Sequence, residues 1–177
     1  MLDALKDMFR RRALRKEASH EPTRICPLDQ VKSAVTFIDV EDTSFNECKI
    51  AVQAFYREMG IKGEIFFFDF RRLTDGERLI TSITTTVLKK DLGWYGRPSR
   101  EKINLMLSGE PDMFISLIPS TDFPIEFMAK CSRARFKVGR IQLPGDTFDI
   151  VVNAPGTAPS SQLEVFRKMT AILSRIK

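Results

Sequence analysis

Apolar runs alternate with segments of helical spacing along this chain, most clearly between residues 112 and 141. Met113–Ile118 is apolar except for Ser116, which suits a buried strand. Phe123–Cys131 has an apolar residue at every fourth position, which predicts a helix with one buried face. Arg135–Ile141 then returns as a strand. Because two parallel strands need a crossover of about a dozen residues or more, this unit predicts a parallel pair.

A second unit of the same kind comes earlier in the chain. Ala34–Val40 is β-branched and apolar, and Glu64–Phe70 repeats that pattern. The helix between them begins near Ser44, where Ser44-x-x-Glu47 has the spacing of a capping box. It ends at Gly60. Its predicted buried face consists of Phe45, Cys48, Val52, Phe55 and Met59.

The remaining segments complete an α/β pattern. We expect a short edge strand at Ile83–Leu88, a helix at Arg100–Leu107 and a strand at Phe148–Val152. A loop at Ala154–Ser160 and a helix starting at Ser161, with Glu164 as its capping-box partner, follow. Residues 33–177 are therefore predicted to form one three-layer α/β domain, with an open, mainly parallel, Rossmann-like sheet and helices on both faces.

The N-terminal segment differs from this domain in charge. Residues 1–24 hold seven basic and four acidic residues, a net of +3, which leaves only +2 of the total +5 for the other 153 residues. Residues 1–18 predict a basic amphipathic helix, with Leu2, Leu5 and Phe9 on one face, and residues 19–32 predict a linker.

Three roles are open for this helix. It can dock on its own domain, bind RNA phosphates, or lie on an anionic membrane surface. Its basic residues are the candidate nucleic-acid contacts: Arg10, Arg11, Arg12, Arg15 and Lys16. Because the segment is rich in arginine, a non-enzymatic module that binds RNA or a ribosomal particle is the leading hypothesis.

A second hypothesis is a small-molecule enzyme or sensor. Ligands of open α/β sheets gather at the carboxyl ends of the strands. These ends supply a possible ligand pocket of Asp39, Asp69, Ser120 and Asp122, with Trp94 from a glycine-flanked loop; Glu41, Asp42 and Asn153 lie nearby. The same carboxylates can instead cap the following helices, and Trp94 can instead anchor its loop.

Familiar catalytic and cofactor motifs do not occur in the sequence. No GxGxxG follows the first strand, and neither GxxxxGK[ST] nor GxSxG is present. The single histidine, His20, and three cysteines without metal-binding spacing predict no metal site and no cofactor. No apolar run reaches the roughly 18 residues that a membrane span needs, so a cytoplasmic location is expected. The oligomeric state is left open.

Three short motifs connect the chain to a known family. They are Asp91-x-x-Trp94-x-Gly96-Arg-Pro, Pro111-Asp112-x-Phe-Ile-x-Leu and Ser132-x-Ala134-x-Phe136-Lys-Val-Gly139. With the basic N-terminal segment, they resemble a family of small bacterial proteins of unknown function. This resemblance implies a Rossmann-like fold and no assigned activity.

A second resemblance is confined to part of the chain. Asp112–Gly139 is similar to the N-terminal domain of heptosyltransferase-like glycosyltransferases. The glycine-rich loop of that family is missing after the first strand, as is its second domain, so this resemblance implies the fold alone.

Overall fold

A computed structural model describes residues 1–77, 82–152 and 160–177 of the chain. Its sheet contains β1 (Ser33–Asp39), β2 (Lys62–Asp69), β3 (Thr86–Leu88), β4 (Met113–Ser116), β5 (Phe136–Gly139) and β6 (Ile150–Val151). Its α-helices are α1 (Leu2–Glu17), α2 (Phe45–Met59), α3 (Arg100–Ser108), α4 (Phe123–Cys131) and α5 (Gln162–Leu173). Short 3-10 helices lie at Leu28–Gln30, Asp75–Glu77 and Lys89–Asp91.

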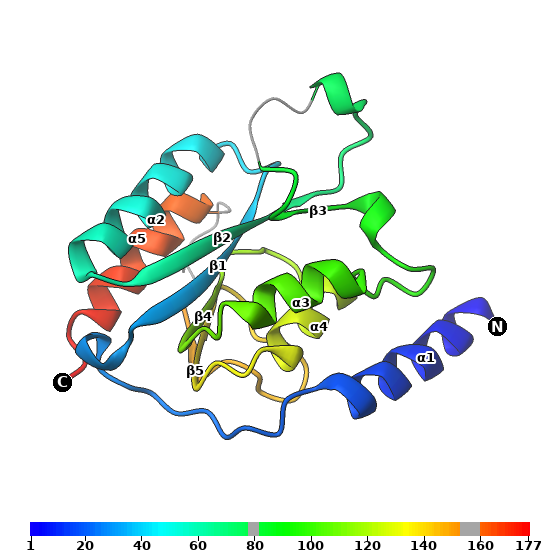
Figure 1. Ribbon diagram of the computed structural model, residues 1–177, viewed down its shortest axis with the longest axis horizontal. Helices are drawn as coiled ribbons and strands as arrows, with labels where there is room; N and C mark the ends of the chain where they lie inside the picture. The colour runs from blue at the N-terminus through cyan, green and yellow to red at the C-terminus, as the bar shows by residue number, and fades with distance from the viewer. Residues whose placement is uncertain (78–81, 153–159) are drawn as a thin grey trace.

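The six strands form one sheet in the order β3-β2-β1-β4-β5-β6, and every pair is parallel (Figure 1). The expected Rossmann-like α/β fold is confirmed, with a wholly rather than mainly parallel sheet. After β3 the chain crosses back to the far side of β1. In sheets of this order, the crevice between β1 and β4 is where dinucleotides bind.

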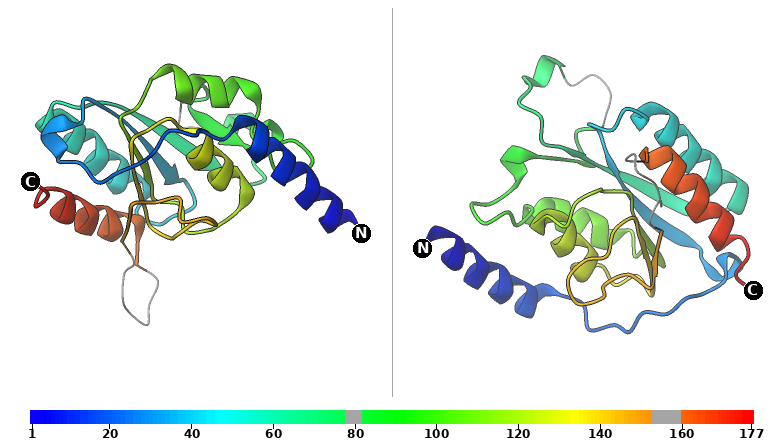
Figure 2. Two further views of the ribbon diagram at one scale, coloured as in Figure 1. Left: turned by 90° about the horizontal axis from the view of Figure 1, so that it is seen from below. Right: turned by 180° about the vertical axis from the view of Figure 1, so that it is seen from behind.

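Helices cover both faces of the sheet, which gives the three expected layers. α2 and α5 lie together on one face, and α3 and α4 lie on the other, with α1 beside α4 (Figures 1 and 2). Alternate residues of β1 enter the two cores: Ile38 packs with Cys48 of α2, whereas Phe37 packs with Phe127 of α4. This alternation explains why the central strand is apolar almost throughout.

Aromatic packing between neighbouring strands accounts for the many phenylalanines. The Phe37 ring stacks on Phe66 of β2 at 5.3 Å and on Phe114 of β4 at 5.1 Å between centroids. These rings are fully buried and carry no polar atom, so the core needs no hydrogen-bond partner for them.

The Phe-Lys-Val-Gly motif of β5 has a structural explanation. Lys137 is buried, and its Nζ donates to the backbone oxygen of Ala129 in α4 at 2.7 Å. At Gly139 a Cβ would lie 2.2 Å from the ring of Phe148. Any larger residue there would displace that buried ring, so this position requires glycine.

Several local predictions of strand length and burial were wrong. The expected strand at 83–88 is shorter, and Ile83 is 78% exposed. Met59, predicted to be buried, is 42% exposed at the end of α2. The strands around Arg135–Ile141 and Phe148–Val152 are also shorter than expected. Asn153 and most of the predicted 154–160 loop fall outside the described residues.

The two predicted capping boxes had different outcomes. The box of Ser161 and Glu164 at the start of α5 is confirmed. The box of Ser44 and Glu47 at the start of α2 is wrong, because the Ser44 side chain makes no cap bond to its own helix. Its hydroxyl instead donates to Asp42 and accepts from the backbone N–H of Leu163.

Candidate functional site

The second half of α1 is fixed to the domain by three kinds of contact. Glu17 accepts hydrogen bonds from Arg97, the shortest at 2.7 Å, and the Arg97 guanidinium lies over the ring of Phe127. Ala13 is buried in the core beside α4. The Phe9 ring packs edge-on against Trp94, with the ring centroids 5.0 Å apart. These contacts fix both the position and the rotation of the helix.

Arg10 belongs to this docked face. Its Nε donates to the Tyr95 backbone oxygen at 2.8 Å, and its guanidinium lies 5.1 Å from the centroid of the Phe123 ring. Arg10 was predicted to be one of the RNA contacts. A local signal separates it from them, because Arg10, Ala13 and Glu17 recur at i, i+3 and i+7 on one side of the helix.

The other four predicted basic residues are exposed, and one of them, Arg11, also borders the pocket between α1 and the strand ends. We call Arg11, Arg12, Arg15 and Lys16 the basic face of α1. All four are exposed, and within the described residues none has a hydrogen-bond or ion-pair partner on its side chain. Their spacing places them within an arc of about 140° at 3.6 residues per turn.

The first half of α1 exposes apolar side chains. Met1, Leu2, Leu5 and Met8 are each more than 40% exposed, and Trp94, on which Phe9 packs, is 53% exposed. The helix tip extends beyond the rest of the chain (Figure 2). The Trp94 loop is thus anchored through Phe9 and Tyr95, one of the two roles that the sequence left open for it.

At the carboxyl ends of β1 and β5 the polar side chains bond to one another and to the start of α5. Asp42 accepts from the backbone N–H of Gln162 at 3.1 Å, and its Oδ2 lies 3.8 Å from Arg140. Arg140 also donates to the backbone oxygen of Ser160. The Gln162 side chain bonds both the N–H and the C=O of Asp39. We call this arrangement the closed half of the carboxyl edge.

Asp42 and Ser44 therefore do act as caps, but on a distant helix. Their side chains accept the backbone N–H groups of Gln162 and Leu163, the first residues of α5. A helix start has unsatisfied N–H groups, and these two side chains complement the cap that Ser161 provides.

The other predicted carboxylates of this edge are also engaged. Asp39 accepts from the backbone N–H of Glu41 at 2.9 Å, and burial raises the pKa of its carboxyl above the ordinary value. Asp69 is 1% exposed and forms a two-pronged ion pair with Arg71, at 2.8 and 3.0 Å. Strong pairing of this kind raises the pKa of the Arg71 guanidinium. No group of three or more potential metal ligands occurs in the part of the chain that the structure describes.

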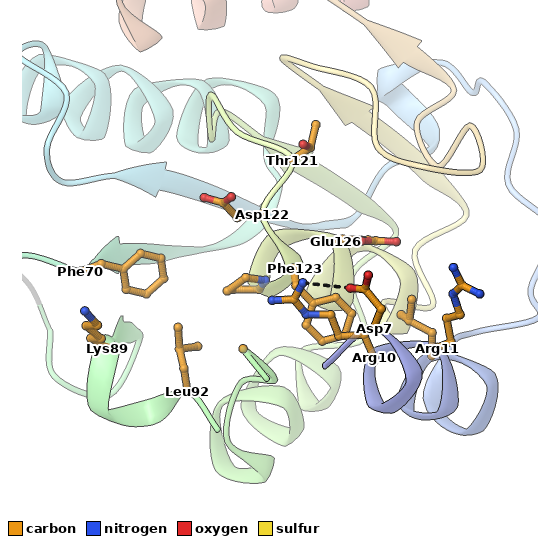
Figure 3. A pocket seen from close by; sticks show the side chains of 13 residues that line it. Asp7, Arg10, Arg11, Phe70, Lys89, Leu92, Thr121, Asp122, Phe123 and Glu126 are labelled. Carbon is orange, nitrogen blue, oxygen red and sulfur yellow. Dashed lines mark hydrogen bonds and ion pairs between the residues drawn. The ribbon is translucent and has the colours of Figure 1, made fainter. Parts of the chain in front are cut away.

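The carboxyl ends of β2, β3 and β4 border a pocket of about 630 Å³, with α1 as its outer wall. We call it the open half. In Figure 3, Phe70, Lys89 and Leu92 lie on one side, with Arg10 and Phe123 opposite them. The remaining lining residues are Asp7, Arg11, Leu14, Gly96, Thr121, Asp122, Pro124 and Glu126.

Only one of the five residues predicted for a ligand site lines this pocket. Asp122 does so, and its carboxylate accepts the Ser120 hydroxyl at 2.9 Å. Asp39, Asp69 and Trp94 do not line it. Arg10 and Lys89 were not among the predicted ligand residues. The strand-end rule gives no place to Arg10, whose helix precedes the first strand, whereas Lys89 directly follows β3, where the rule does apply.

Fold and site together define a Rossmann-like α/β protein with a docked basic helix and a pocket at the strand ends. The sequence model of a family of unknown function (DUF6913) matches residues 6–172 of the chain. The chain belongs to this family, as its motifs led us to expect. Comparisons with curated proteins and with solved structures found no match. The similarity to heptosyltransferase-like glycosyltransferases was thus not found.

Proposed function

We propose that this protein is a binding module that attaches to RNA, free or in a ribosomal particle, through the basic face of α1. The observation that carries the proposal is the set of four unpaired, exposed cations on one face of the described helix. Cations that pair with phosphates release counterions from the nucleic acid, which favours binding of any sequence.

The docking of α1 supports this reading. Glu17 and Arg97 neutralise each other within the protein, and Arg10 is held by the Tyr95 backbone oxygen. In the second half of α1, the cations left for a partner are therefore those of the basic face. The docked helix already has a fixed position and rotation. Its binding to a phosphate backbone therefore orders fewer groups than the binding of a flexible tail would. We propose the cytoplasm as the place where this happens.

Salt-dependent binding to single-stranded RNA tests the proposal. The variant Arg12→Gln/Arg15→Gln/Lys16→Gln should bind at least tenfold more weakly than wild type at low salt. The slope of log affinity against log salt should fall in magnitude by about 2, since each lost phosphate contact removes roughly 0.7.

A variant of equal charge provides the control. Arg167→Gln/Lys168→Gln/Arg175→Gln removes three exposed cations from α5 and the turn after it. It should bind RNA like wild type apart from a small loss from net charge. Equal affinities and equal slopes for the two triple variants would contradict the proposal.

Attachment to an anionic membrane surface is a second candidate, because the first half of α1 exposes Met1, Leu2, Leu5 and Met8. RNA phosphates offer no apolar surface on which these side chains could be buried, whereas the interface of a lipid bilayer does. In the part of the chain that is described, no helix is long and apolar enough to cross a membrane, so this contact would be peripheral.

Vesicle co-sedimentation separates the two candidates. Leu5→Gln/Met8→Gln should abolish binding to phosphatidylserine vesicles and leave RNA binding unchanged if the membrane is a genuine target. Failure of the wild-type protein to sediment with these vesicles would rule out the membrane candidate.

A further inference from the structure

The open half of the carboxyl edge is large enough to hold a small molecule. Its volume of about 630 Å³ lies within the roughly 300–1,000 Å³ of ordinary ligand sites. Phe70 and Leu92 form an apolar wall, and opposite them the Arg10 guanidinium lies over the Phe123 ring, 5.1 Å from its centroid (Figure 3). The apolar wall suits one face of a flat ring.

The pocket also carries a surplus of positive charge. Glu126 is neutralised by Lys130, at 2.6 Å on the same helix. The lining then contains three cations, Arg10, Arg11 and Lys89, against two carboxylates, Asp7 and Asp122, which leaves a net charge of +1. A ligand that carries negative charge complements this surplus.

Two of these cations flank the space from opposite sides. Arg10 is held in place by the Tyr95 oxygen at 2.8 Å, and its contact with Asp7 is long, at 3.5 Å. Lys89 is exposed and has no side-chain partner within the described residues. Figure 3 shows them across the gap from each other. An arginine held in a fixed orientation opposite this lysine is well suited to bind phosphate oxygens.

Asp122 adds an acceptor to the same space. Its carboxylate is exposed, and the Ser120 hydroxyl that donates to it at 2.9 Å occupies one of its oxygens. The remaining oxygen can accept hydroxyl groups of a ligand. An apolar wall, two cations that can bind a phosphate, and a hydroxyl acceptor are the three features that a nucleoside phosphate requires.

We propose that this pocket binds a nucleoside monophosphate, with the phosphate between Arg10 and Lys89, the sugar hydroxyls at Asp122 and the base against Phe70 and Leu92. The site is separate from the β1–β4 crevice, which the contacts of Asp42, Arg140 and Gln162 close. Because Arg10 comes from α1, ligand binding would also hold that helix against the domain.

Calorimetric titration of the full chain with AMP, adenosine and inorganic phosphate tests the site. AMP should bind more tightly than adenosine or phosphate alone. Lys89→Ala should weaken AMP about tenfold, the effect of one lost charge-assisted hydrogen bond, and leave adenosine unchanged. Asp122→Asn should weaken both AMP and adenosine.

Two controls make the result specific. Lys168→Ala removes an exposed lysine from α5 and should leave AMP affinity unchanged. Amide NMR shifts on AMP addition should concentrate at Leu92, Gly96 and Phe123. Absent AMP binding, equal AMP affinity for wild type and Lys89→Ala, binding of inorganic phosphate as tight as that of AMP, or shifts located elsewhere would each overturn the proposal.

This site and the proposed RNA contact can fail separately. Arg12, Arg15 and Lys16 do not line the pocket, so their triple variant should retain AMP affinity while it loses RNA. Lys89→Ala should show the opposite pattern.

Discussion

The two halves of the carboxyl edge contain similar kinds of residue. They differ in whether the side chains are paired within the protein or remain accessible to a ligand. In the closed half, Asp42, Arg140 and Gln162 bond to one another and to the start of α5. In the open half, Lys89 and Arg11 have no such partners among the described residues, and a pocket remains between them and the strand ends. A charged residue at a strand end thus indicates a ligand site only when the fold supplies no internal partner for it.

The difference follows from what packs beside each half. α5 begins next to the ends of β1 and β5, and its first N–H groups donate to the side chains of Asp42 and Ser44, which act as caps. At the other end of this edge, the long side of α1 faces the ends of β2 and β3. The helix contacts α4 and the Trp94 loop. A helix that begins at an edge closes it, whereas one that passes alongside leaves a gap.

The largest expected effect is in the closed half. Asp42→Ala removes the acceptor of Ser44 and Gln162 and leaves Arg140, whose side chain is 13% exposed, without its carboxylate. We expect the free energy of unfolding to fall by about 4 kcal/mol, because a mostly buried charge is left unpaired and a helix cap is lost. Urea denaturation measures this value.

Asp122→Ala is the matched change in the open half. Its carboxylate is exposed and makes no cap bond to α4, so the loss should stay within about 0.5 kcal/mol. Equal losses for Asp42→Ala and Asp122→Ala would remove the distinction between the two halves.

A smaller effect is expected from the buried lysine of β5. Burial lowers the pKa of Lys137 to about 8 from its ordinary 10.5. Above pH 8 the native lysine is neutral while the unfolded chain still binds the proton, so unfolding becomes less favourable as pH rises toward 10.5. Between about pH 7 and 9.5, the stability of wild type relative to Lys137→Met should rise by about 2 kcal/mol.

Paired denaturation curves of wild type and Lys137→Met at several pH values measure this change. The difference should be flat below pH 7, where both the native and the unfolded lysine are charged. A difference that stays constant up to pH 9.5 would show that Lys137 keeps its proton despite its burial.

A smaller effect than that of Lys137 concerns the wall of the open half. Arg97→Ala breaks the ion pair with Glu17, whose side chain is 24% exposed, and should lower global stability by about 1 kcal/mol. Amide hydrogen exchange of Ala13 and Leu14 should accelerate at least tenfold, while that of β1 should accelerate by no more than the roughly fivefold that a loss of about 1 kcal/mol in global stability gives. Arg167→Ala, an exposed change on α5, should alter neither. Unchanged exchange in α1 would show that other contacts suffice to dock it.

The central strands and their direction were predictable from the sequence. β1, β2, β4 and α4 lie close to their predicted ranges, and α4 matches residue for residue. Long apolar runs between helical segments define parallel strands through local spacing alone. The short strands β3 and β6 were placed less well, because pairing at an edge is decided by neighbours rather than by the segment itself.

The candidate site was only partly predictable. The strand-end rule located the right edge of the sheet and one lining residue, Asp122. It could not distinguish Asp42, which α5 uses as a cap, from a carboxylate available to a ligand. It also could not assign Arg10 to a pocket, since nothing local relates α1 to strand ends that lie more than fifty residues away.

The sequence by itself determined the parallel α/β fold, the family and the concentration of positive charge in the first helix. Those properties depend on the period of apolar residues and on composition, which local sequence contains in full. Tertiary structure alone decided which charges are paired and which are available. Pairing depends on side chains that the fold brings together, such as Arg97 with Glu17 and Arg140 with Asp42. Because these partners are far apart in the sequence, local patterns do not reveal the pairs.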